Sequence, residues 1–135
     1  MTVRAIAVTE GQKNVTFQIT GWWNSPREVL QQSEWQRIVE VGELTHPAAH
    51  LRLDAVYHAI ADGLEIQLAW NTDGEKIPMI QLSGKGRLDF SEVTGIHSMS
   101  KTPIDGISFR LLGEPKNPSP IILVVLDMSK HHGEH

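Results

Sequence analysis

Alternation of apolar and polar residues with a period of two is the feature that most constrains this chain. In the stretch 64–70, LEIQLAW, the large apolar side chains occupy every second position. The stretch 14–20, NVTFQIT, repeats the same pattern. Successive side chains of a β-strand point to opposite faces of a sheet, so this pattern predicts strands with one buried face.

The same alternation, together with short runs of β-branched residues, predicts further strands along the chain. A strand is also preferred over a helix at 35–41, where the β-branched Ile38, Val39 and Val41 cluster. The predicted strands are 2–8, 15–20, 35–41, 51–61, 64–70, 77–83, 107–112 and 121–128, with 88–90 as a continuation of the sheet after the glycines at 84 and 86. About eight antiparallel strands joined mostly by short turns predict an all-β, single-domain β-sandwich or barrel over residues 1–135, with a jelly roll favoured.

Local signals predict how some of these strands are connected. Asp62-Gly63 is a hairpin signal, because glycine accepts a positive φ, and it predicts that 51–61 pairs with 64–70. Ser25-Pro26-Arg27-Glu28 has the residues of a capping box with proline at the first helical position, which predicts a short helix near residues 26–32. Residues 129–135 are expected to form a short C-terminal tail, flexible or ordered by a partner.

Composition argues against several classes of function. The chain has no cysteine, which excludes a disulfide framework and a thiolate metal site and fits assembly in a reducing cytoplasm. Its net charge is −4 and its twelve lysines and arginines are scattered, so we expect no nucleic-acid partner. No apolar run approaches the roughly 20 residues of a membrane span, so we expect no membrane partner.

The stretch 82–90, LSGKGRLDF, superficially resembles a phosphate-binding loop. A Walker A loop needs Ser or Thr after its Gly-Lys and a helix behind it, whereas here Gly86 and Arg87 follow Lys85 and the next residues look like strand. The glycines are therefore predicted to kink or bulge a strand, with Lys85 and Arg87 facing solvent or an acidic neighbour.

The histidines and carboxylates show no catalytic or metal-binding arrangement. Asp54 and His58 are predicted on the same face of one strand, but about 13 Å apart, too far for a hydrogen bond. The histidines of the tail, SKHHGEH, lack the rigid placement that a metal site requires. We therefore expect no catalytic, cofactor-binding or metal-binding residues and no enzymatic activity. A cupin-type metalloenzyme is a third-ranked alternative, which predicts a bound transition metal.

Adjacent tryptophans provide a candidate contact site. Trp22 and Trp23 must point to opposite faces of a strand, so one is expected in the core and the other exposed or at an interface. An exposed tryptophan on a β-sandwich can stack on a sugar or anchor a protein contact, and the sequence leaves both uses open.

An ordered series of short motifs covers residues 51–130. In chain order they are Leu68-Ala69-Trp70, Asp73 in a turn, Leu82-Ser83-Gly84-Lys85-Gly86, Asp89-Phe90, Asp105-Gly106 and a last strand closing at Lys130. This series resembles a group of small, jelly-roll-like virion structural proteins of tailed bacteriophages, of the capsid cement or decoration type. The chain departs from the pattern in its proline-rich connection GEPKNPSP and its extra tail HHGEH, and residues 1–50 match only in a strand near Val15–Thr20.

The resemblance implies a non-enzymatic protein on the outer surface of a capsid, made in the cytoplasm of the bacterial host. It implies the major capsid protein as partner and self-association as dimers or trimers. The alternatives are a glycan-binding β-sandwich module, or a collar, neck or tail protein of the same virion. The residues expected to make partner contacts are Thr2, Arg4, Trp22, Trp23, His131 and His132.

Overall fold

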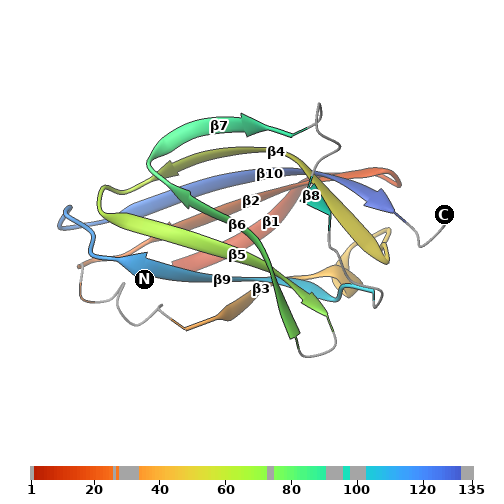
Figure 1. Ribbon diagram of the computed structural model, residues 1–135, viewed down its shortest axis with the longest axis horizontal. Helices are drawn as coiled ribbons and strands as arrows, with labels where there is room; N and C mark the ends of the chain where they lie inside the picture. The colour runs from red at the N-terminus through yellow and green to blue at the C-terminus, as the bar shows by residue number, and fades with distance from the viewer. Residues whose placement is uncertain are drawn as a thin grey trace.

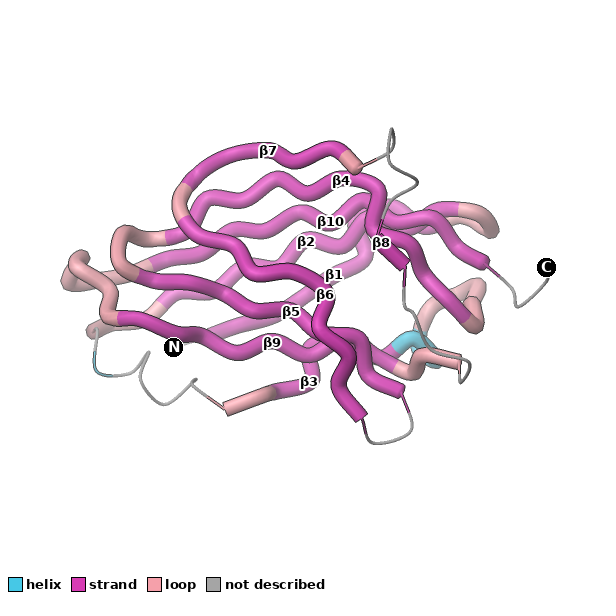
Figure 2. Tube along the Cα trace, viewed as in Figure 1, coloured by secondary structure: helices cyan, strands magenta, loops and turns pink. Residues whose placement is uncertain are grey.

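The computed structural model describes residues 2–25, 27, 34–72, 75–90, 96–97 and 103–131. These residues form two antiparallel β-sheets that face each other (Figure 1). Strands account for most of the described chain (Figure 2). The predicted all-β sandwich is therefore confirmed.

The two sheets, called here the large and the small sheet, differ in strand number. The large sheet has the order β1-β2-β10-β4-β7, and the two-residue β8 also pairs with β4. The small sheet has the order β3-β9-β5-β6. The strands of the large sheet are β1 (Thr2–Glu10), β2 (Asn14–Trp22), β10 (Ile121–His131), β4 (His50–Ile60), β7 (Lys85–Asp89) and β8 (Ile96–His97). Those of the small sheet are β3 (Gln36–Glu40), β9 (Gly106–Gly113), β5 (Leu64–Thr72) and β6 (Glu75–Ser83), and a 3₁₀ turn, η2 (Val41–Glu43), follows β3.

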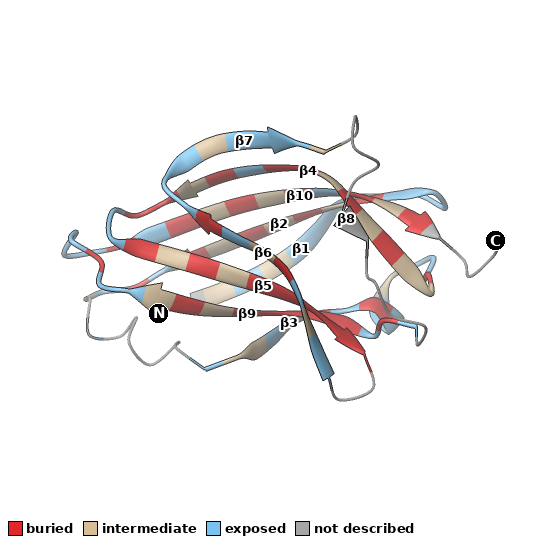
Figure 3. Cartoon of the chain, viewed as in Figure 1, coloured by how far each residue is buried: buried red, intermediate tan, exposed pale blue. Residues whose placement is uncertain are grey.

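The hydrophobic core lies between the facing sides of the two sheets (Figure 3). Every second side chain of β2 and β5 points into it, as the alternation predicted; Phe17 and Trp70 are both almost fully buried. Each large apolar side chain moved out of water in this way stabilises the fold by roughly 1.5–3 kcal/mol. The core, rather than any helix, therefore holds the fold together.

Consecutive strands mostly alternate between the two sheets, an arrangement compatible with the expected jelly roll.

The predicted hairpin of β4 and β5 is wrong, because β4 belongs to the large sheet and β5 to the small one. The Asp62-Gly63 turn instead carries the chain across the sandwich. Gly63 has φ +84°, and a Cβ there would lie 2.1 Å from the carbonyl oxygen of Glu114, so backbone crowding as well as φ requires glycine.

The glycine-containing stretch 82–90 also crosses between sheets. β6 ends at Ser83 in the small sheet and β7 begins at Lys85 in the large sheet, with only Gly84 between them. Gly84 has φ +65°, a conformation that L side chains rarely adopt. Its carbonyl oxygen accepts hydrogen bonds from the backbone N–H of Ile60 (2.9 Å) and from Nδ1 of His58 (3.0 Å). The predicted kink is thus a corner at which the chain changes sheets.

One residue in β4 shifts the alternation of that strand. The β10 residues Asp127 and Met128 pair with Ala55 and Leu53, which leaves Asp54 as an extra, bulged residue. The predicted common face of Asp54 and His58 is therefore wrong. The Asp54 carboxylate lies on the outer side, where it accepts a hydrogen bond from Arg52 (2.6 Å), whereas His58 is buried.

Two predictions about irregular segments have different outcomes. The predicted tail begins too early, because β10 continues to His131 and pairs with His50 at its end. Residues 132–135 lie outside the described residues. So does nearly all of the helix predicted near 26–32, since residues 26 and 28–33 are not described.

A buried lysine ties the last strand to the first. The Nζ atom of Lys130 donates hydrogen bonds to Oε2 of Glu10 (2.8 Å) and to the carbonyl oxygens of Gly11 (2.6 Å) and His46 (2.7 Å), which uses all three of its protons. The Glu10 carboxylate also accepts from the backbone N–H groups of His46 (2.7 Å) and Thr45 (3.0 Å). The ammonium of Lys130, and then these N–H groups, lower the pKa of Glu10 from 4.5 to about 2.

Candidate functional site: two outward sheet faces

The outer face of the large sheet carries exposed apolar side chains from four neighbouring strands. Trp22 and Ile121 pair directly across β2 and β10 and are 48% and 62% exposed. Ile6 and Tyr57 extend the group onto β1 and β4, because both share one row with Gln18 and Val125. Residues directly opposite in a sheet point to the same face. This group is called the outer apolar band and comprises Ile6, Trp22, Tyr57, Ile121, Leu123 and Val125.

Basic side chains lie at both margins of the outer apolar band. Arg4 is exposed on the edge strand β1, in the same row as Leu123. Lys85 and Arg87 are exposed on the opposite edge strand, β7, where Arg87 pairs with Tyr57 of the band. The two cations of the glycine-containing stretch therefore face outward beside apolar surface.

The structure separates the residues predicted to contact a partner. Arg4 lies on β1 and Trp22 on β2, and these two share the outer face of the large sheet, while the backbone of Thr2 begins β1 and pairs with Trp22. Trp23 is 1% exposed and packs in the core, so it is removed from the candidate contact residues. His131 ends β10 at the other end of the strand from Trp22, and His132 lies outside the described residues.

Most members of the outer apolar band were missed by sequence reasoning. The run 121–126, IILVVL, is apolar at every position, so its sequence does not reveal which residues of β10 face outward. The outward face of Tyr57 also depends on the fold, because the bulge at Asp54 shifts the alternation of β4 before it. The pairing of Ile121 with the predicted Trp22 is visible only in the fold.

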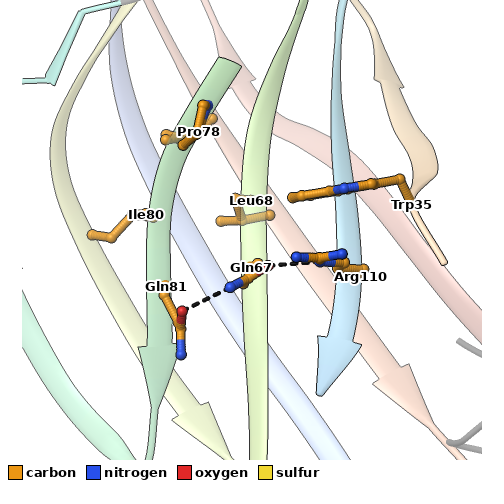
Figure 4. Close-up of a pocket in the computed structure, with 8 residues that line it drawn as sticks. Trp35, Gln67, Leu68, Pro78, Ile80, Gln81 and Arg110 are labelled. Carbon is orange, nitrogen blue, oxygen red and sulfur yellow. Dashed lines mark hydrogen bonds between the residues drawn. The ribbon is translucent and has the colours of Figure 1, made fainter. Parts of the chain in front are cut away.

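The outer face of the small sheet carries a hollow of about 290 Å³ (Figure 4). A row of polar side chains borders it, because Gln81 of β6, Gln67 of β5 and Arg110 of β9 are directly opposite one another. Nε of Arg110 donates to Oε1 of Gln67 (2.6 Å), and Nε2 of Gln67 donates to Oε1 of Gln81 (2.8 Å). The Arg110 guanidinium lies 4.7 Å from the centre of the Trp35 ring. The residues that line the hollow are Trp35, Gln67, Leu68, Pro78, Met79, Ile80, Gln81 and Arg110.

Neither a metal cluster nor a membrane-spanning helix occurs in the described part of the chain. It contains no group of three or more histidine, aspartate or glutamate side chains placed to hold a metal ion. Within the same residues no helix has the length and apolar character needed to cross a membrane.

His58, the buried histidine of β4, has its Nδ1 in a hydrogen bond with the carbonyl oxygen of Gly84 and so fixes the corner between the sheets.

Comparison with known proteins gives matches of structure only. The sequence matches no protein-family model and no curated protein. The fold is similar to a chain of the cyanophage Pam1 capsid asymmetric unit, with a TM-score of 0.49, 6% identity and coverage of 93% of this chain and 92% of that one. It is also similar to a chain of the capsid of Helicobacter pylori bacteriophage KHP30, with a TM-score of 0.40, 8% identity and coverage of 94% and 93%. A cupin superfamily protein of Desulfitobacterium hafniense gives a TM-score of 0.27 at 11% identity, with coverage of 93% and 76%. All three TM-scores are below 0.5.

Proposed function

We propose that this protein is a non-enzymatic structural protein of a phage particle, and that it acts as a decoration or cement protein on the outside of the major capsid shell. The observation that carries the proposal is the outer apolar band. Exposed tryptophan, tyrosine and aliphatic side chains gather there on one face of a sheet whose opposite face already forms the core. Contiguous exposed apolar surface of this kind marks interaction sites. The series of motifs ending at Lys130 points to a virion as the setting.

The chemistry of the band suits a protein partner. Trp22 and Ile121 lie side by side and can enter a pocket as a single anchor, as large side chains at the centre of interfaces commonly do. Arg4 at one margin and Lys85 and Arg87 at the other favour a partner surface with acidic groups around an apolar centre, which fixes orientation. The partner in this proposal is the major capsid protein.

Cementing follows from the number of copies. Each copy gains only a modest free energy of binding from one apolar face. When copies join one another and bridge neighbouring shell subunits, the binding of one copy raises the effective concentration of the next at the shell, so the assembly binds more tightly than any single copy. We therefore include self-association as dimers or trimers in the proposal. Nucleic acid and membrane are not part of it.

A co-sedimentation assay tests the proposal directly. Purified protein is added to capsids that lack it, and the bound fraction is compared for wild type, Trp22→Ser and Ile121→Ser. Both variants are expected to bind at least about tenfold more weakly, since each loses an anchor worth on the order of 2 kcal/mol. The control is Leu88→Ser, because Leu88 is 41% exposed but opposite the inward-facing Val56, outside the band. Undiminished binding of both band variants contradicts the proposed contact face.

Location and copy number on intact particles distinguish a decoration protein from its alternatives. Many symmetric copies over the shell support the proposal, whereas a few copies at one vertex indicate a collar, neck or tail protein. A stoichiometric transition metal in the purified protein would contradict the non-enzymatic assignment and favour the cupin alternative. Saturable polysaccharide binding that Trp22→Ser abolishes would favour the glycan-binding alternative at this face.

A further inference from the structure

We propose that the hollow on the outer face of the small sheet is a second binding site, separate from the outer apolar band, and that it takes an acidic saccharide through a carboxylate on the sugar ring. The two surfaces belong to different sheets and face away from each other across the core. Binding at the hollow therefore does not depend on the proposed contact with a capsid shell.

The first argument is the orientation of the polar row. Nε2 of Gln81 donates to the carboxylate of Glu65 (2.5 Å), which fixes the amide so that its Oε1 faces Gln67. Gln67 is oriented in turn, with its own Oε1 facing Nε of Arg110. A carboxylate accepts and does not donate, so Glu65 sets the direction of every hydrogen bond in the row. Glu65 is thus a positioning residue for Arg110.

The second argument is the hydrogen-bonding capacity that this row leaves unused. The row occupies only Nε of Arg110, and in the described part of the chain no acceptor bonds to Nη1 or Nη2 of that residue. Each glutamine amide also keeps one N–H outside the row. The site therefore presents mainly donors, and Arg110 is the only charged side chain among the described residues that line it. A guanidinium edge pairs best with a carboxylate, and the amide donors suit hydroxyl and ring oxygens.

The third argument is the apolar part of the hollow. In Figure 4 Trp35 and the exposed Pro78 lie on the same side of the polar row, Trp35 with its ring over β9 near Arg110 and Pro78 on β6. The guanidinium stacked on the ring holds both groups in place. The volume of about 290 Å³ is at the lower end for small-molecule sites, which suits a ring-sized group. A saccharide with a carboxylate meets all three demands: anionic group, several oxygens and an apolar ring face.

Isothermal titration calorimetry on the full chain tests this site with defined probes. The probes are trigalacturonate and an α2,8-linked sialic acid dimer; the methyl ester of trigalacturonate removes the charge, and hexaglutamate supplies carboxylates without sugar rings. We expect saturable binding of at least one acidic saccharide, with little binding of the ester or the peptide. No saturation by either saccharide at millimolar concentration, or equal binding of hexaglutamate, overturns the proposal.

Variants locate the binding within the fold. Arg110→Gln is expected to weaken saccharide binding about 10- to 100-fold, since it removes a charged hydrogen-bond partner. Glu65→Gln keeps Arg110 but removes the fixed direction of the row, so it is expected to weaken binding less, and it remains informative if Arg110→Gln does not fold. Lys76→Gln removes a positive charge from the same face of β6, and Trp22→Ser alters the other sheet; both should bind as wild type does. Unchanged binding by Arg110→Gln and Glu65→Gln together refutes the assignment to this hollow.

Discussion

The Nζ atom of Lys130 lies 2.8 Å from Oε2 of Glu10, across 120 positions of the sequence. The lysine side chain is completely buried. We predict that Lys130→Met lowers the free energy of unfolding well beyond the ±0.5 kcal/mol that is usual for surface changes, because the Glu10 carboxylate loses its cationic partner and two carbonyl oxygens lose a donor. Urea denaturation measures the loss, and Lys76→Met on the exposed part of β6 is the control. Similar losses of unfolding free energy in the two variants would contradict a stabilising role for the hydrogen bonds of Lys130.

The contact between Lys130 and Glu10 also predicts that stability depends on pH in the acid range. The pKa of Glu10 is lowered to about 2 in the fold, from 4.5. A carboxyl group with a lowered pKa stabilises the folded state above its unfolded pKa, so this contribution is complete above about pH 4.5 and is lost as the pH falls toward 2. In Glu10→Gln the free energy of unfolding should therefore fall less steeply between pH 5 and 2.5 than in wild type. Parallel pH profiles of the two proteins would refute this.

Two glycines with positive φ should respond differently to the same substitution. At Gly84 no atom lies within 4 Å of the position that an added Cβ would occupy, so Gly84→Ala is expected to cost only the roughly 1–2 kcal/mol of a left-handed L-residue. At Gly63 the added Cβ would meet the carbonyl oxygen of Glu114 at 2.1 Å, so Gly63→Ala must also move backbone and is expected to cost clearly more. Chemical denaturation of the two variants gives the comparison. Equal losses of unfolding free energy in the two variants would show that the positive φ alone determines the cost at both positions.

Two core tryptophans carry a polar atom that the core does not satisfy. Nε1 of Trp23 and Nε1 of Trp70 are buried, and neither has a hydrogen-bond partner in the part of the chain that the structure describes. A buried unpaired donor lowers the free energy of unfolding by about 1–3 kcal/mol, which offsets part of the stabilisation that packing of the indole ring provides. We predict that Trp70→Phe loses less than about 2 kcal/mol, whereas Trp70→Ala loses about 3–5 kcal/mol. Thermal denaturation distinguishes the two, and a loss from Trp70→Phe as large as that from Trp70→Ala would contradict the argument.

Period-two alternation located several of the longer strands because each has one face against a single core, whereas β8 was not predicted and β7 was predicted only as 88–90. It placed strands at the positions of β2, β5 and β9, and the preference for β-branched residues correctly favoured a strand at β3. The pairing of strands is a property of the whole sandwich, and here the local turn signal misled. Asp62-Gly63 has the sequence of a hairpin turn, but its strands lie in different sheets. The pattern of residues ended the last strand at 128 because Ser129 and Lys130 are polar, although a buried ion pair satisfies Lys130; the motif series, which closes at Lys130, comes within one residue of the observed end at His131.

The candidate surfaces depend on contacts between distant segments, which explains why sequence reasoning found little of them. Trp22 was predicted from its adjacency to Trp23, but its neighbour Ile121 is about a hundred residues away in the chain and comes beside it only through the β2–β10 pairing. The hollow joins Trp35, before β3, with Arg110 of β9 and side chains of β5 and β6. Neither surface has a local sequence signal of its own.

The single-residue corner at Gly84 has a consequence for how the sandwich fluctuates. It covalently joins the edge strands β6 and β7, whereas the opposite edge strands, β1 and β3, border a hollow of about 160 Å³ between the sheets. Local opening should therefore begin at β1, and at its Thr2 end, since the Glu10 end is held by Lys130. Amide hydrogens of Val3–Ala5 are expected to exchange with solvent faster than those of Leu123–Val125 in β10, which is paired on both sides. The first strand can then detach transiently while the rest of the core stays closed, and the edge of β2 that this exposes becomes available to a strand from another chain.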